Sequence, residues 1–560
     1  ADHRESHPRA VTLAGDDSWV ISAQAIGVKF DGRPGHYVVD ETQARIALRR
    51  LARRIDSGRA LDIEATLSEL RVVAREGMGK PVSIAMREVQ PALTASVAQA
   101  AGETLATVTL PVPDTPRGRN MRAALAALDS TVIRSGSWLS IRDALGPLAP
   151  SRDFVFAASD DQRVCLGGGA EACAHLLERA AREAGLTVAH DELPPPLAAA
   201  TPMTRDLLVG NSSGANVLVV CESSGDRRTL RIMGRRLPRA RPQLSRRPAS
   251  APGGVSVALV GDVLPTGPVD DPGALGRLMR STDLTLANLE CPASRRGRPL
   301  PVKLTPGEWA FRADPDAAGR CLDEWGVGAV SLANNHALDY GPDALADTLS
   351  VLGDEDIGVA GAGADEASAW RPTLLDRGGL RIALLCCVGS DSLPTAEEFA
   401  ATSDRPGLAT LTVDAEHLPD ACDELAERVR GLRWRADVVI VSLHSGREAT
   451  GLPTDAQQRL ARAAREAGAD LVWGHHPHRL QPLEVAGEGD GLIAYSLGNF
   501  IFPPARSKQA HSGVLVVRWG REGLLGAGFV PAIIEGRTPR PVRDAALRQQ
   551  IAGELLGARG

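Results

Sequence analysis

The chain of 560 residues has little cysteine, and no pair of its cysteines has the spacing of a zinc or redox motif. Eight cysteines are spread between residues 165 and 422, and none of them forms a CxxC motif. This number excludes a disulfide scaffold, and the spacing argues against a structural zinc knuckle or a thioredoxin-like motif. Cys386 and Cys387 lie within an apolar run, so we expect them to pack as small core residues.

Long apolar runs and an excess of positive charge are also missing. No segment reaches the roughly 18 to 20 apolar residues that a membrane-spanning helix needs. The formal net charge is −6, so no overall basic field points to nucleic acid. Arg occurs 59 times and Lys four times, a bias that we attribute to a GC-rich bacterial genome. The chain begins with Ala rather than Met, which leaves the compartment unknown and an upstream leader or anchor open.

The amino-acid composition is that of an ordinary globular protein, with 43% hydrophobic and 24% charged residues. The length predicts two to four domains. The clearest boundary is an Arg- and Pro-rich segment, residues 235–254, in which six Arg fall between Arg235 and Arg247 without any acidic residue. Such a composition favours an extended linker. We therefore expect the fragments on its two sides, near residues 1–235 and 251–560, to fold separately.

Short apolar runs alternate with helical patterns after the linker. The helical patterns include residues 342–352 and 454–468, the second with Thr454 as its N-cap and Gly468 at its end. This alternation predicts an α/β fold with largely buried sheets. The predicted strands are residues 255–262, 283–290, 327–336, 380–388, 436–446, 469–476, 491–500 and 512–520.

Metal-binding and acid–base residues follow these predicted strands at their carboxyl ends. An α/β sheet places its ligands at this edge, because the strand ends release loops into a shared crevice. Each residue alone has a plainer explanation: a surface or core His, Asn in a turn, or Asp262 as a helix N-cap. Their common position is what favours a site, and the residues are Asp262, Glu290, Asn335, His336, His444, His476 and His478.

The chemistry of this set indicates a divalent transition metal. Two carboxylates, one amide and three imidazoles suit Mn, Zn or Fe, and the absence of thiolate argues against a closed structural zinc site. A carboxylate can bridge two ions, and such a pair can hold both oxygens of a phosphoryl transfer, so one or two ions are expected. His336 directly follows Asn335, which places an acid–base group beside the ligands.

Six segments in this half resemble the CapA family, the poly-γ-glutamate capsule biosynthesis proteins. They are VALVGDVLPTG, DLTLANLECP, GVGAVSLANNHALDYGPDAL, VSLHSGRE, GHHPHRLQPLE and AYSLGNFIF, and they cover about residues 255–505. The resemblance implies a calcineurin-like metallophosphoesterase fold, an α/β/β/α sandwich over residues 255–535. It also implies roles for the site: Asp262, Glu290, Asn335, His444, His476 and His478 as metal ligands, with Glu290 bridging, and His336 as the general acid.

Two positions depart from the pattern of these families. Phosphoesterases place a His two residues after the first Asp, where this chain has Leu264. A weak second metal site or a single-ion enzyme follows from this loss. Ser445 replaces the usual aromatic residue after His444, whereas Glu448 is retained. Glu448 is predicted either to orient the ring of His444 or to contact a substrate amine, with a merely solvated side chain as the plainer alternative.

The N-terminal half is predicted as a mixed α+β region. Residues 118–234 resemble the VanW-like domain of bacterial envelope proteins, although the usual Gly-Gly-Gly-Cys-Gln run is replaced by GGGAEAC, with Cys173 displaced. Residues 1–117 loosely resemble the peptidoglycan-binding-like region that often precedes such domains. The resemblance implies binding or scaffolding, with cell wall or polymer as the partner. Residues 536–560 are predicted as a helical tail.

These observations favour a metal-dependent hydrolase or transferase. Its substrate is predicted to be a small molecule or polymer with a phosphoester or γ-glutamyl-type amide bond, in envelope polymer or peptide metabolism. One metal site could serve either bond. Two alternatives stay open: a non-catalytic factor of capsule synthesis or export, and a soluble enzyme of specialised metabolism on the same fold.

Overall fold

The computed structural model describes two long stretches of the chain and several short pieces. The long stretches are residues 103–234, without 212, 214 and 225, and residues 254–557, without 487–490, 504–506 and 522. The predicted linker lies outside the described residues except for Gly254, and so does much of the predicted peptidoglycan-binding-like region. Within the described parts, we find no helix with the length and apolar character needed to span a membrane.

The short pieces before residue 89 form small paired strands and one long helix. The strand β1 (Val11–Ala14) pairs antiparallel with β2 (Ser18–Ile21) and parallel with β6 (Val82–Ser83). The other elements are β3 (Val28–Phe30) paired with β4 (Tyr37–Val39), β5 (Arg59–Leu61) paired with β7 (Met86–Glu88), and the helix α2 (Ile63–Arg75).

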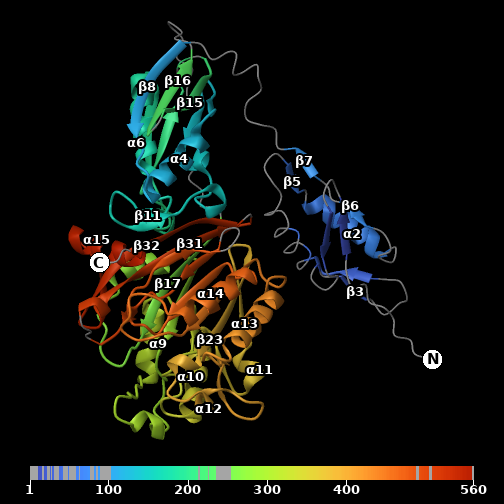
Figure 1. Ribbon diagram of the computed structural model, residues 1–560, viewed down its shortest axis with the longest axis vertical. Helices are drawn as coiled ribbons and strands as arrows, with labels where there is room; N and C mark the ends of the chain where they lie inside the picture. The colour runs from blue at the N-terminus through green and yellow to red at the C-terminus, as the bar shows by residue number, and fades with distance from the viewer. Residues whose placement is uncertain are drawn as a thin grey trace.

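Residues 103–234 form two antiparallel sheets with helices packed on them (Figure 1). The larger sheet has the order β8 (Glu103–Pro111), β16 (Arg227–Gly234), β15 (Val217–Ser224) and β9 (Val132–Ile133). The smaller has the order β10 (Trp138–Ser140), β14 (Arg205–Gly210) and β13 (Thr187–Glu192). The helices are α4 (Pro116–Leu128), α5 (Ile141–Leu145), α6 (Glu171–Glu183) and α7 (Pro195–Ala199). Strands and helices are mixed here, as predicted, while the likeness to VanW-like domains stays a prediction.

Two large sheets are built mainly by the C-terminal half. The first has ten strands, and its path is β11 (Phe156–Ala158), β12 (Val164–Leu166), β32 (Gly523–Glu535), β31 (His511–Gly520), β17 (Val255–Val263), β18 (Leu284–Leu289), β19 (Ala329–Ser331) and β20 (Gly358–Ala360), with β30 (Asn499–Ile501) and β33 (Thr538–Pro541) beside it. The second has seven, namely β22 (Thr373–Arg377), β23 (Leu380–Gly389), β26 (Val438–His444), β27 (Leu471–His475), β29 (Leu492–Ala494) and β28 (Leu483–Val485), with β25 (Thr410–Leu411) beside β23.

The two sheets pack face to face with helices on the outside, which confirms the predicted sandwich. Along β26, Val438 and Ile440 belong to the core between the sheets, whereas Val439 and Val441 face the helices α13 (Leu418–Leu432) and α14 (Asp455–Glu466). Successive side chains of a strand point to opposite faces, so both faces of this strand are covered. The first sheet is covered by α8 (Gly273–Arg280), α9 (Pro315–Glu324) and α10 (Pro342–Asp354).

Most local predictions for this half are confirmed. Each predicted strand overlaps an observed one, and Thr454 caps α14 through a reciprocal pair of hydrogen bonds with Gln457. Gly468 follows that helix with φ of 109°, a conformation that glycine adopts easily. Cys386 and Cys387 are fully buried in the core.

Two features of the described structure bear on the predicted organisation of the chain. The hairpin β11–β12 comes from the N-terminal half but pairs with β32, so the two halves share one sheet (Figure 1). Val164 lies opposite Phe529 in this pairing, and both belong to one core. The tail predicted as helical begins with the strand β33, and only α15 (Ala545–Leu555) is helical.

Candidate metal centre

The predicted site residues meet where strands of both sheets end. Asp262 is the penultimate residue of β17, Glu290 follows β18, and His444 is the last residue of β26. All three side chains are fully buried. The other predicted residues, which are 5–7% exposed, are Asn335, His336, His476 and His478.

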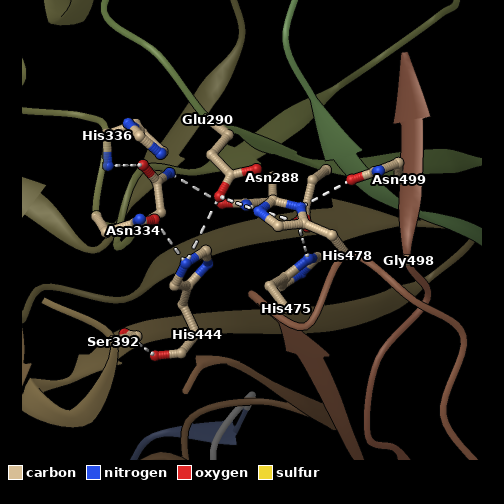
Figure 2. A network of polar contacts seen from close by, with 12 residues as sticks. Asn288, Glu290, Asn334, His336, Ser392, His444, His475, His478, Gly498 and Asn499 are labelled. Atoms are coloured by element: carbon tan, nitrogen blue, oxygen red, sulfur yellow. Dashed lines mark hydrogen bonds and ion pairs between the residues drawn. The ribbon is translucent and has the colours of Figure 1, made fainter. Parts of the chain in front are cut away.

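The first group of ligand atoms comes from Asp262, Glu290 and His478. One atom of each lies within 4.8 Å of the others, a geometry that could hold a metal ion. Nδ1 of His478 is 3.1 Å from Oδ2 of Asp262, and its Nε2 is 3.8 Å from Oε1 of Glu290. Figure 2 shows the side chains of Glu290 and His478 meeting at this point.

The second group approaches the same oxygen of the Glu290 carboxylate as the first. Nε2 of His444 is 3.7 Å from Oε1 of Glu290 and 3.0 Å from Oδ1 of Asn335. The ring of His476 lies 5.0 Å from the ring of His444, centroid to centroid. Oε1 of Glu290 therefore lies within 3.8 Å of an imidazole nitrogen from each group.

A divalent cation fits this site because several buried donor atoms have no hydrogen-bond partner. Both carboxyl oxygens of Glu290 and Nδ1 of His476 are buried and unpaired. An unsatisfied buried polar group costs about 1–3 kcal/mol, and more if it is charged. Oxygen and imidazole donors without thiolate are typical of Mn, Zn or Fe.

The segment that carries the last two imidazoles has an unusual backbone. His476 and His478 have φ of 94° and 52°, in the left-handed region that side chains other than glycine rarely adopt. Backbone hydrogen bonds hold this turn in place, from Ser445 to His475 (3.3 Å) and from Ala449 to Pro477 (2.9 Å). Such strain persists only where the surroundings impose it, and it concentrates at functional sites.

The charges in the site perturb one another. Burial and the nearby Asp262 carboxylate raise the pKa of Glu290 well above its ordinary value. Burial lowers the pKa of His478, but Glu290 and Asp262 outweigh it and raise this pKa to about 10. Burial, together with His478, lowers the pKa of His476 to about 3. The centre thus holds one strongly basic imidazole beside two carboxyl groups.

His336 lies beside the ligands and is held by a buried chain of charges. Its Nδ1 is 2.8 Å from Oδ2 of Asp339, whose Oδ1 is 3.3 Å from Nζ of the buried Lys303. The ring of Phe311 packs 4.6 Å from the ring of His336. Burial lowers the pKa of His336, although Asp339 opposes this effect. Asp339 occupies Nδ1, so Nε2 is the nitrogen left for substrate.

A cavity of about 360 Å³ opens beside the ligands. Asn335, His336 and His476 form part of its lining, and Arg447 and Glu448 stand at it with exposed side chains. Among the described residues, no hydrogen bond joins Glu448 to His444. The geometry therefore gives no support to ring orientation by Glu448, and its exposed side chain fits either substrate contact or simple solvation.

Several residues that complete the site were not predicted from the sequence. Asn288 donates to Oδ1 of Asp262 (2.9 Å), and Asn334 donates to Oδ1 of Asn288 (3.0 Å). His475 approaches the same Asp262 oxygen, and Asn499 approaches Nδ1 of His478, each at 2.8 Å (Figure 2). Asn288 could have been found, because it lies two residues before Glu290 and residues at this spacing share one face of a strand.

Comparisons with known proteins concern this half of the chain. A family model described as "Bacterial capsule synthesis protein PGA_cap" matches residues 256–504. The PGA biosynthesis protein CapA of Bacillus subtilis is 29% identical over 49% of this chain and 67% of its own length. The capsule biosynthesis protein CapA of Bacillus anthracis is 30% identical over 42% of this chain.

A third relative is a probable polyglutamine synthesis accessory protein of Mycobacterium tuberculosis, 32% identical over 37% of this chain. The chain spans only 55% of the Bacillus anthracis protein and 52% of the mycobacterial one. The similarity therefore concerns the part of the chain that carries the candidate metal centre.

Proposed function

We propose that the chain is a metal-dependent hydrolase or transferase in the synthesis of capsule polymer, because residues 256–504 match the family model of bacterial capsule synthesis proteins and resemble two CapA proteins. The reaction proposed is cleavage or transfer at a phosphoester or a γ-glutamyl-type amide. The name of the Bacillus subtilis relative, a PGA biosynthesis protein, supports poly-γ-glutamate as the polymer. The unpaired buried donor atoms of the metal centre carry the proposal.

The residues of the centre divide the ligand roles. Asp262, Glu290 and His478 would hold one divalent ion, and Asn335, His444 and His476 would hold a second with Glu290 shared between them. Bound there, the metal would polarise the P=O or C=O bond and lower the pKa of a water molecule. Leu264 stands where phosphoesterases have an imidazole, so the first group offers only three protein ligands. Its affinity for a metal ion would be lower for this reason.

His336 would move the proton to the leaving group. Asp339 holds Nδ1 of the ring, so the imidazole presents Nε2 toward the cavity that it lines. The Asp339 carboxylate also stabilises the protonated ring against the effect of burial. A positioned acid of this kind contributes about 10²–10⁴-fold to the rate.

The residues that line the cavity favour a substrate that carries both a negative and a positive group. Arg447 offers a guanidinium to a carboxylate or phosphate, and Glu448 offers a carboxylate to a substrate amine. The amino-terminal unit of a γ-glutamyl chain carries one group of each kind. For residues 118–234 we propose a VanW-like role in contact with cell wall or polymer.

Two chromogenic substrates test the reaction. Metal-loaded protein should hydrolyse bis(4-nitrophenyl) phosphate or γ-glutamyl-4-nitroanilide, and Glu290→Gln should lose both metal and turnover. Glu397→Gln, an exposed carboxylate on the helix α12 (Ala396–Phe399), is the matched control and should keep both. Full metal content without turnover on either substrate or on poly-γ-glutamate would contradict the enzyme proposal.

One alternative is favoured by a specific residue. Leu264, in place of the imidazole of phosphoesterases, is what a non-catalytic factor of capsule synthesis or export would tolerate. Such a factor has no need of His336. Replacement of His336 by Asn would then leave every measured property of the metal-loaded protein unchanged.

A further inference from the structure

Trp309 lies in the wall of the cavity beside the metal centre, with Asn335, His336 and His476. It is 70% exposed, and among the described residues it is the one tryptophan with an exposed side chain. A single exposed apolar side chain needs no explanation by itself. An indole in a cavity wall, however, offers a large flat surface to any molecule that enters. The place of Trp309, rather than its exposure, makes it a candidate for contact with substrate.

The loop that carries Trp309 is anchored from within the fold. The anchor is the buried Lys303, in the 3₁₀ turn η2 (Pro301–Leu304). Its Nζ lies 3.2 Å from Oε2 of Glu308 and 3.3 Å from Oδ1 of Asp339. The backbone N–H of Glu308 donates to the carbonyl of Thr305 at 3.1 Å. Glu308 directly precedes Trp309, so these contacts fix the backbone from which the indole extends.

The same loop is tied to the proposed general acid. The backbone N–H of Phe311 donates to Oδ2 of Asp339 at 2.7 Å, and the same oxygen approaches Nδ1 of His336. The ring of Phe311 packs 4.6 Å from the ring of His336, centroid to centroid. Trp309 thus lies two residues from a side chain that contacts His336. An acid that protonates a leaving group must lie beside it. The indole therefore stands on the leaving-group side of the cavity.

The cavity wall has a polar part and an apolar part. Among the described residues that line it, the large apolar side chains are those of Trp309, Leu393 and Pro394. The metal ligands and the general acid serve the bond that reacts, and Arg447 and Glu448 suit charged groups of the substrate. The apolar part has neither of these tasks. It fits a part of the substrate that is flat and carries no charge.

We propose that Trp309 determines which leaving group the site accepts, by stacking its indole on a planar group next to the bond that reacts. In a γ-glutamyl chain this group would be the amide of the following unit, and in a phosphoester it would be an aromatic ring on the leaving oxygen. Stacked planar groups attract each other beyond the effect of the area that they bury. The proposal rests on the function proposed above, because the role of His336 defines the leaving-group side.

Two pairs of ligands test the proposal. One pair is γ-glutamyl anilide and γ-glutamyl methylamide, the other is phenyl phosphate and methyl phosphate, and only the first member of each pair has a planar ring. Surface plasmon resonance on the immobilised, metal-loaded full chain measures each Kd, and the continuous flow replaces any ligand that is turned over. In at least one pair, the aryl member should bind at least about tenfold more tightly than its methyl partner. The pair that binds identifies the head group.

The ratio of the two affinities within a pair is the readout, because a purely structural effect of a substitution leaves this ratio unchanged. Trp309→Ala should reduce the ratio to about threefold or less, and Trp309→Phe, which keeps a flat ring, should retain most of it. Trp434→Ala is the matched control and should keep the ratio of the wild type. Trp434 lies just before β26, at the opposite end of that strand from His444, and Cζ of Arg433 lies 4.9 Å from the centre of its ring.

The proposal is overturned if the wild type binds none of the four ligands, if neither pair shows the aryl preference, or if Trp309→Ala keeps it. Fluorescence of the wild type gives a second measurement that depends on no variant. The bound aryl ligand should protect the exposed indole from quenching by acrylamide, and unchanged quenching at saturation also overturns the proposal.

Turnover of the chromogenic substrates is a separate result. A preference that depends on Trp309, found without any turnover, contradicts the enzyme proposal but keeps Trp309 as a ligand contact. Turnover without the preference supports the enzyme and overturns the role of Trp309.

Discussion

Nδ1 of His475 lies 2.8 Å from Oδ1 of Asp262, and both side chains are fully buried. Asn288 donates to the same oxygen, so two groups hold this end of the carboxylate while Oδ2 faces His478. Residues that orient a metal ligand in this way raise its affinity without contacting the ion. His475 is thus a positioning residue in the proposed metal centre.

We expect His475→Ala to weaken metal binding by about 10–100-fold, because Asp262 loses one of the two groups that orient it. The variant should still fill with metal at saturating concentration. His476→Ala should instead lose metal from the second group of ligands. Titration of the metal-free proteins measures both affinities, with the exposed His417→Ala as control. The reverse ranking would place the imidazole of His475 in the coordination shell.

Removal of the shared carboxylate should have a larger effect. Both oxygens of Glu290 are buried without a partner, so Glu290→Gln should lower metal affinity by more than about 100-fold. In the metal-free state the same change should leave the stability of the fold nearly unchanged, since the raised pKa of Glu290 favours a neutral carboxyl group, which an amide of the same size replaces. Elemental analysis and the Tm of metal-free protein measure the two effects. If Glu290→Gln lowers the Tm but keeps its full metal content, the carboxyl group of Glu290 has a structural role and does not bind the metal.

Metal binding should release protons at pH 7. The pKa of His478 is about 10 and that of Glu290 is raised, so the metal-free centre holds protons that a metal must displace. Affinity should therefore rise about tenfold per pH unit for each proton released. Calorimetry in two buffers of different ionisation enthalpy counts the protons. Binding that releases none would contradict the charge state assigned to His478.

The stability of the metal-free protein should depend on pH in the corresponding sense. The folded pKa of His478 lies above its ordinary value of 6.5, so its stabilising effect is complete below pH 6.5 and is lost as the pH rises toward 10. The free energy of unfolding should fall across this window. His478→Asn, in the same titration, should remove most of the slope.

The general acid can be tested through the leaving group. His336→Asn should keep the metal but lose about 10²–10⁴-fold in rate, with the smaller loss on 4-nitrophenyl esters, which need little protonation. Asp339→Asn should produce part of the same effect, because it leaves Nδ1 of His336 without its carboxylate. An equal loss on activated and alkyl substrates together with metal depletion would make His336 a ligand.

The strand ends and the candidate site residues at them were predictable because short-range patterns encode them. The run from Val255 to Val263 alternates with a helical segment, and this fixes the edge on which Asp262 falls. Asp339 and Lys303 were not predictable, since their contact with His336 depends on a loop path that no periodicity describes. The pairing of Val164 with Phe529 joins residues far apart in the chain, and such contacts leave no local pattern.

The hairpin β11–β12 covers one side of β32 in the ten-stranded sheet. A chain that begins at residue 254 would lose β11 and β12, so β32 would become an open edge and the core would lose Phe156, Val164 and Leu166. An exposed apolar strand edge pairs with other chains, so this fragment should aggregate. A chain that begins at residue 103 keeps the hairpin and should remain monomeric. Light scattering and Tm compare the two fragments under one set of conditions. If the shorter fragment is monomeric with an unchanged Tm, the hairpin is an accessory to the sheet, and the two halves fold separately after all.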